Sequence, residues 1–150
     1  MGLPYRHIAC CMDDSAAAER ALAQATALRE AAGARLSLVH VGPFPLLVEE
    51  VDGETRVLPD DLNATAREWI GRVAAATGGA EAVFLEGLPA PTACRWAADA
   101  GVDLIVTAAH HGRLEGLLIG SFSEYVVRHA PCPVLVVREP RPLSGSEPPR

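Results

Sequence analysis

Two segments of the chain carry residues whose chemistry suits a ligand site. The first is Asp13-Asp14-Ser15, where carboxylates and a hydroxyl directly follow an apolar run. A carboxylate at such a place can accept hydrogen bonds from a base or a ribose, whereas the simpler interpretation is that these residues cap a helix. Both interpretations stay open for Asp14 and Ser15. The ligand interpretation is favoured for Asp13, because it lies at the tip of the predicted strand.

The second segment runs from Ala109 to Ser123 and contains two motifs, Ala109-His110-His111-Gly112-Arg113 and Gly120-Ser121-Phe122-Ser123. A helix is expected to begin at Ser121, where free N–H groups and the positive end of the helix dipole form an anion site. The serine hydroxyls add donors, and Gly112 allows close approach of backbone to a ligand. Alternatively, the glycines only permit turns and Ser121 only caps the helix.

Other chemistries are poorly supported by the residues present. The adjacent His110 and His111 point apart on an extended chain and have no third ligand spaced near them, so a metal site is not expected. All 13 basic residues are arginine, which excludes a lysine Schiff base and the lysine of a phosphate-binding loop of the Gly-Lys-Ser/Thr type. The chain also lacks a nucleophile elbow, a metalloprotease histidine pair and a dinucleotide-type glycine pattern after the first strand.

Bulk properties fit one domain. The chain has 150 residues, of which 49% are hydrophobic and 21% charged. Its net charge of −6 argues against nucleic acid as a partner, because binding to phosphate backbones depends on Lys and Arg. No apolar run approaches the ~20 residues that cross a bilayer, so no membrane association is expected. The N-terminus lacks the features of a signal peptide, and a cytoplasmic location is expected.

The four cysteines show no Cys-x-x-C or zinc-type spacing. Cys10 and Cys11 lie in an apolar run, Cys94 in a predicted helix and Cys132 between two prolines. Buried, reduced thiols are the favoured interpretation, and a redox role for Cys10 and Cys11 is the less favoured alternative.

The elements that position these residues alternate between strand and helix. Short apolar runs predict five buried strands: His7–Met12, Arg35–Val41, Glu81–Glu86, Asp103–Ala108 and Val134–Val137. Helical periodicity or capping residues predict helices from Ser15 to Gly33, from Asp60 or Asp61 to Gly78, from near Pro91 to Ala100, and from Ser121 to His129. Between the second strand and second helix, Asp52-Gly53 predicts a small hairpin of Val48–Val51 with Glu54–Val57.

Alternating strands and helices predict an α/β fold with a parallel sheet. In such sheets, ligands bind beyond the carboxyl ends of the strands, at the point where the strand order reverses. The loops after the first and fourth strands would lie side by side if those strands are neighbours. The domain is expected to span residues 1–138, and the proline-rich residues 139–150 are expected to form a disordered tail.

These residues resemble the universal stress protein family from about Tyr5 to Arg138. The opening strand with its Asp-x-Ser turn, the second strand and the Gly87-Leu88-Pro89 and Asp103–Val106 segments all resemble the family. The most specific segment runs from Gly120 to Val137, which is close to the family's signature ending.

The resemblance implies a three-layer sandwich with a five-stranded parallel sheet in the order 3-2-1-4-5, a fold described as adenine nucleotide alpha hydrolase-like. It also implies a homodimer paired through the last strand, formed by Val134, Leu135, Val136 and Val137. An apolar edge strand left exposed favours aggregation, which gives such pairing a physical reason.

The nucleotide-binding branch of the family carries Gly-x2-Gly-x9-Gly-Ser/Thr. Ala109 stands at its first glycine, Gly112 at its second and Gly120-Ser121 at its last pair, but only seven residues separate Gly112 from Gly120. Two fewer residues remove up to ~7 Å of chain reach. The residues implied to contact a nucleotide are Cys11, Asp13, Val41, Ala109, Gly112, Gly120, Ser121, Phe122 and Ser123.

Three functions follow from the resemblance. The first is a stress-response regulatory protein that binds ATP or another adenine nucleotide, with Mg²⁺ as an optional companion and at most weak hydrolysis. The second is a family member that acts only through protein–protein contacts, its altered loop having lost the nucleotide. The third is a true nucleotide hydrolase, which needs an acid–base and metal set that the sequence does not show. The first is the prediction.

Overall fold

The computed structural model describes residues 2–44, 48–57, 61–109 and 120–140. Five strands form one parallel sheet in the order β5-β2-β1-β6-β7. Leaving aside the hairpin strands, this is the predicted order 3-2-1-4-5, so the predicted fold is confirmed. The sheet strands are β1 His7–Cys11, β2 Arg35–Gly42, β5 Glu81–Glu86, β6 Leu104–Ala108 and β7 Val134–Val137.

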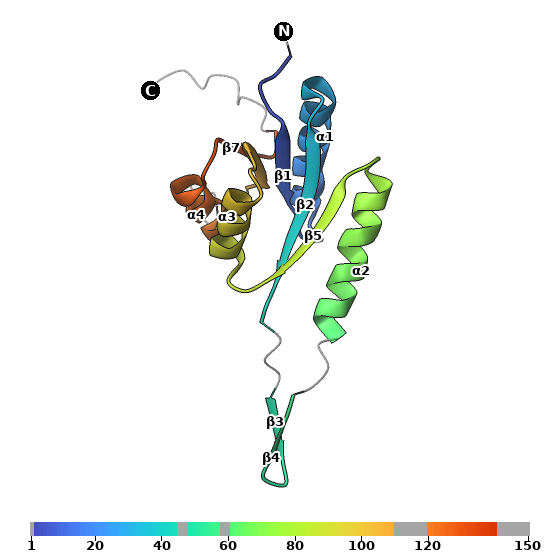
Figure 1. Ribbon diagram of the computed structural model, residues 1–150, viewed down its shortest axis with the longest axis vertical. Coiled ribbons are helices and arrows are strands. Elements are labelled where there is room, and N and C mark those ends of the chain that lie inside the picture. The colour runs from blue at the N-terminus through green and yellow to red at the C-terminus, as the bar shows by residue number, and fades with distance from the viewer. Residues whose placement is uncertain (1, 45–47, 58–60, 110–119, 141–150) are drawn as a thin grey trace, which may run out of the picture.

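Helices cover both faces of the sheet and produce three layers (Figure 1). On one face, α1 and α2 pack over a core centred on Ile8, Leu38 and Val106. On the other, α3 and α4 pack over Ala9, Val39 and Ile105. The helices are α1 Ala16–Ala32, α2 Asp61–Ala76, α3 Pro89–Asp99 and α4 Ser121–His129.

The ends of the helices follow the expected local chemistry. Ser15 caps α1 by accepting a hydrogen bond from the N–H of Ala18, and Gly33 ends it with a φ of 66°. The second helix begins with Asp61 as its first helical residue, and the alternative cap Asp60 lies outside the described residues. The third helix ends at Asp99, one residue before the predicted end. Most element boundaries therefore fall within two residues of those predicted.

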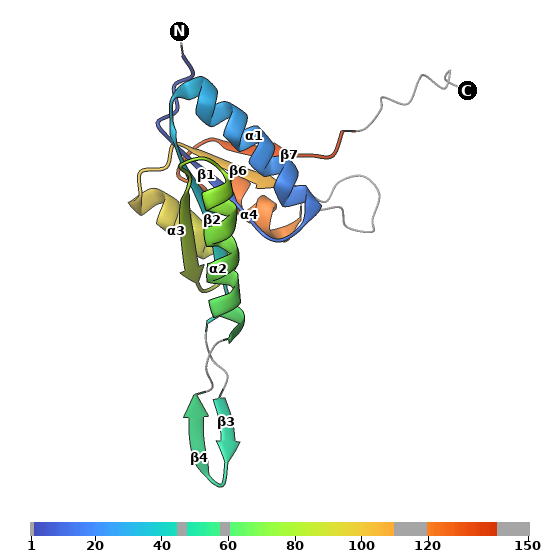
Figure 2. The same ribbon diagram turned by 90° about the vertical axis from the view of Figure 1, so that its right-hand side faces the viewer.

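The predicted hairpin is present as β3 Val48–Val51 and β4 Glu54–Val57, joined through Asp52-Gly53. Both central residues of its turn have positive φ, 55° and 77°, as expected of a tight hairpin turn. The hairpin projects away from the sheet and its helices in both views (Figures 1 and 2). Of the predicted tail, residues 141–150 lie outside the described residues.

The sheet order places a switch point between β1 and β6, the two central strands. Strand β1 pairs with β2 on one side and with β6 on the other. The chain leaves β1 through α1 and returns in β2, on one side of β1. It leaves β6 and returns through α4 in β7, on the other side of the sheet's centre. The carboxyl ends of β1 and β6 are therefore the expected place for a ligand.

Candidate functional site

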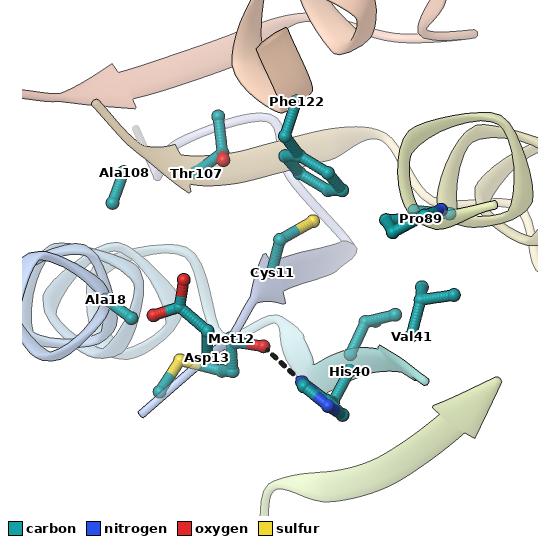
Figure 3. Close-up of a pocket in the computed structure, with 12 residues that line it drawn as sticks. Cys11, Met12, Asp13, Ala18, His40, Val41, Pro89, Thr107, Ala108 and Phe122 are labelled. Atoms are coloured by element: carbon teal, nitrogen blue, oxygen red, sulfur yellow. Dashed lines mark hydrogen bonds between the residues drawn. The ribbon is translucent and has the colours of Figure 1, made fainter. Parts of the chain in front are cut away.

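A pocket of about 220 Å³ lies at the carboxyl ends of the central strands. Its walls come from β1, β2 and β6 and from the ends of three helices, as Figure 3 shows. The lining residues are Cys11, Met12, Asp13, Ala18, Val39, His40, Val41, Pro89, Ala93, Thr107, Ala108 and Phe122. The pocket occupies the switch point predicted from the order of the elements.

Asp13 supplies the carboxylate of the pocket. Its Oδ1 accepts a hydrogen bond of 3.0 Å from the N–H of Ser15 and a second from the Ser15 hydroxyl. The same Ser15 oxygen accepts from the N–H of Ala18 at 3.1 Å. Ser15 thus caps α1 and orients Asp13 at the same time, so both sequence interpretations apply to this segment. Asp14 is exposed and is not among the residues that line the pocket.

The wall toward β2 and α3 is mainly apolar. It contains Cys11, Val41, Pro89 and Ala93. Burial, with smaller contributions from Cys94 and Cys132, raises the pKa of the Cys11 thiol to about 12. The group is therefore a neutral thiol at physiological pH and contributes apolar surface rather than a nucleophile.

The first turn of α4 forms the opposite end of the site. Gly120 precedes the helix with a φ of 89°, a backbone conformation that favours glycine. The N–H of Glu124 makes the first helical bond, to the Gly120 carbonyl at 2.9 Å. The N–H groups of the three preceding residues lie ahead of that bond, as at any helix start. Phe122 lines the pocket and Ser121 is exposed.

Ser123 has a different place from the one expected of a ligand donor. Its side chain is only 1% exposed, and its hydroxyl donates to the Ala108 carbonyl at 2.8 Å. The Ser123 oxygen also lies 3.2 Å from the Thr107 hydroxyl oxygen. In this structure the Ser123 hydroxyl links α4 to the end of β6 by a hydrogen bond.

The remaining predicted residues belong to the glycine loop. Ala109 is half-buried beyond β6, where its N–H donates to the Val137 carbonyl at 2.9 Å. Gly112, like His110, His111 and Arg113, lies outside the described residues. Of the nine residues predicted to contact a nucleotide, the pocket brings together Cys11, Asp13, Val41 and Phe122.

Several pocket residues were missed by sequence reasoning. Met12, Val39, His40, Thr107 and Ala108 lie in or beside the strand ends that the sequence did identify, so the strand boundaries were a usable signal. The imidazole Nδ1 of His40 is 2.8 Å from the Met12 carbonyl and holds the chain after β1 against β2.

Neither a metal-binding cluster of side chains nor a membrane-spanning helix is present among the described residues. Within the described ranges, no three or more His, Cys, Asp or Glu side chains come close enough to hold a metal ion. Among the same residues, no helix has both the length and the apolar character needed to cross a membrane.

Comparison with known proteins points to a single family. Residues 4–138 match the model of the universal stress protein family. A universal stress protein of Thermus aquaticus, encoded 3′ of a QAH/OAS sulfhydrylase, is 35% identical over 139 residues, which cover 89% of this chain and 99% of the relative.

Solved structures share the fold. One universal stress protein, solved in complex with cAMP, has a TM-score of 0.63 and 24% identity, covering 89% of this chain and 96% of that chain. Another, from Archaeoglobus fulgidus and solved with dAMP, has a TM-score of 0.65 and 21% identity, covering 89% of this chain and 98% of that one.

Proposed function

Because the chain belongs to the universal stress protein family, we propose that it is a stress-response regulatory protein that binds ATP or another adenine nucleotide in the pocket between β1 and β6. The observation that carries this proposal is the composition of that pocket. One wall is apolar, one side chain is a carboxylate, and the first turn of a helix closes the far end. These are the three environments that a base, a sugar and a phosphate require.

The apolar wall suits the base. The side chains of this wall offer an apolar surface against which a planar ring can pack. They are Cys11, Val41, Pro89 and Ala93. The volume of about 220 Å³ is smaller than the ~300–1,000 Å³ of typical ligand pockets. We therefore expect the pocket to enclose the base and sugar and to leave the phosphates outside it.

The phosphates would meet the start of α4. Free N–H groups and the positive end of the dipole favour an anion there, and the exposed Ser121 can add its hydroxyl. The chain contains no lysine, so a phosphate must be held by backbone N–H groups, hydroxyls, arginine or histidine. Such a site suits retention of a nucleotide more than its rapid hydrolysis. We propose binding with at most weak hydrolysis, with or without Mg²⁺.

The class of ligand is supported by related proteins. Two universal stress proteins of this fold were solved with cAMP and with dAMP. Both ligands pair an adenine base with a single phosphate. An adenine nucleotide is therefore the ligand with which to test this chain.

We further propose a cytoplasmic homodimer that pairs through β7. Among the described residues, this strand is an edge of the sheet and pairs with β6 alone. Its four residues, Val134 to Val137, are apolar and only half-buried in the single chain. Covering this edge with a second copy would remove both its exposed apolar surface and its unpaired backbone groups.

The test of nucleotide binding uses the purified full chain. Nucleotide released by denaturation is identified by mass spectrometry, and ATP is titrated by calorimetry with and without Mg²⁺. Co-purified adenine nucleotide, or saturable heat, is the expected result. The absence of both at millimolar ATP would favour the second candidate, a protein that acts through protein contacts alone. The specific observation in its favour is Ala109 in place of a glycine, together with the short spacing from Gly112 to Gly120.

A further inference from the structure

Two hydroxyls and a carbonyl form a buried hydrogen-bond relay where β6 meets α4. The Ser123 hydroxyl lies 2.8 Å from the Ala108 carbonyl oxygen and 3.2 Å from the Thr107 hydroxyl. Thr107 is 2% exposed and Ser123 is 1% exposed. Both side chains are thus buried, and hydrogen bonds in such surroundings are stronger than in water.

The direction of the relay follows from counting hydrogens. A carbonyl oxygen only accepts, so the single hydrogen of the Ser123 hydroxyl is used on Ala108. The contact between the two hydroxyls must then be donated by Thr107. The Thr107 oxygen consequently has lone pairs left and no hydrogen to offer another group.

Thr107 also lines the pocket, together with Asp13 (Figure 3). Strand β6 is hydrogen-bonded to β1 with Val106 opposite Cys10, so Thr107 lies one residue further on, beside Cys11. An ionised carboxylate, like the Thr107 oxygen, can only accept. Thr107 and Asp13 therefore both require a ligand group that donates.

We propose that Thr107 is a specificity-determining residue of the proposed nucleotide site: its oxygen accepts a hydrogen bond from a sugar hydroxyl and selects a ribose over a dideoxyribose. The inference rests on the proposed function, because it assumes that the pocket holds a nucleotide. A phosphate oxygen also only accepts, so it gains nothing at this wall. The relay thereby orients the ligand, with its sugar hydroxyls toward Thr107 and Asp13 and its phosphate toward α4.

The test compares the dissociation constants of AMP and 2′,3′-dideoxy-AMP, measured by calorimetry on the full chain. Wild type should bind AMP more tightly. Thr107→Val keeps the shape of the side chain but removes the acceptor, and should lower the ratio of the two constants roughly 3- to 10-fold, as expected for one hydrogen bond. Thr107→Ser restores the hydroxyl and should restore most of the ratio. Thr77→Val is the matched control, because that hydroxyl bonds the Val73 carbonyl on α2, away from the pocket.

The outcomes separate this inference from the proposed function. Equal binding of the two nucleotides by wild type, or an unchanged ratio in a folded Thr107→Val protein, overturns the role of Thr107 while nucleotide binding stands. If Thr107→Val does not fold, Thr107→Ala, which also removes the oxygen, takes its place: a lowered ratio supports the role of Thr107 and an unchanged ratio overturns it. Failure of wild type to bind either nucleotide removes the proposed function, and this inference with it.

Discussion

The hydroxyl of Ser123 on α4 donates a 2.8 Å hydrogen bond to the carbonyl of Ala108, the last residue of β6. This bond joins the start of a helix to the end of a central strand at the edge of the pocket. It fixes where the first turn of α4, including Phe122, lies relative to the pocket wall. The geometry of the site therefore depends on a residue that does not line it.

Replacing Ser123 with alanine should lower the free energy of unfolding by about 1–3 kcal/mol, because the buried Ala108 carbonyl would lose its donor. Urea denaturation followed by circular dichroism measures the change. Ser121→Ala is the control, since Ser121 is exposed and its loss should stay within about 0.5 kcal/mol. Equal effects of the two substitutions would mean that the bond to Ala108 contributes little.

Enlarging the side chain at Val41 should close the pocket. Val41→Phe adds a ring to the apolar wall and should weaken AMP binding at least roughly tenfold in a calorimetric titration. Val83→Phe provides a matched control, because Val83 is a half-buried strand residue on the same face of the sheet but does not line the pocket. Equal loss of affinity in both variants would point to general destabilisation of the fold.

A charge on the last strand should dissociate the proposed dimer. Val136→Asp places a carboxylate on the edge strand β7, where burial against a second copy would leave it without a compensating partner. Light scattering should report the mass of a monomer. Val51→Asp in the hairpin is the control, since Val51 is already exposed, and it should leave the dimer intact. A dimer that persists in Val136→Asp would place the interface elsewhere.

The four thiols, all with raised pKa values, should react slowly in the folded protein. Because the pKa of the Cys11 thiol is raised to about 12, far less of it is ionised at pH 8 than of a thiol at the ordinary value of 9.0. Burial also raises the pKa values of Cys10, Cys94 and Cys132. Iodoacetamide at pH 8 should therefore label the chain slowly when native and quickly in urea. Rapid native labelling of Cys11, located by mass spectrometry, would argue against a raised pKa for this thiol.

The same thiols should make the fold sensitive to alkali. Above pH 9 the unfolded chain releases thiol protons that the folded chain retains, so the unfolded state binds fewer protons and the free energy of unfolding falls as pH rises. The decline should continue toward pH 12, where the folded Cys11 thiol itself ionises. Urea denaturation at pH 8, 9 and 10 measures this slope. An increase in stability over that interval would contradict the assigned direction.

The sequence predicted the strands well because each is a short apolar run bounded by turn or capping residues, as His7–Cys11 is bounded by Asp13. Parallel strands buried on both faces produce that pattern directly. The strand order came from the resemblance to a family, since apolar runs alone do not specify which strands pair. Part of the pocket then followed, because Cys11, Asp13 and Val41 lie at or just beyond the ends of adjacent strands.

Other parts of the site were beyond sequence reasoning for physical reasons. Pro89 and Ala93 reach the pocket only because α3 packs across the end of β2, a tertiary contact with no local signal. Ser123 was predicted as a ligand contact together with Ser121, which stands two residues before it in the sequence. Two helical residues span about 200° around the axis, so the two hydroxyls face opposite sides. The buried Val126, three residues after Ser123, shows that Ser123 lies on the inner side.

The most direct test of the account is an NMR titration of the uniformly ¹⁵N-labelled full chain with AMP. Binding at the proposed site predicts progressive, saturable shifts of the amide signals of Asp13, Thr107 and Phe122, while those of the remote Glu50 and Glu68 stay in place. Signals at the pocket that do not move up to millimolar AMP, or shifts confined to residues outside it, would contradict nucleotide binding between β1 and β6.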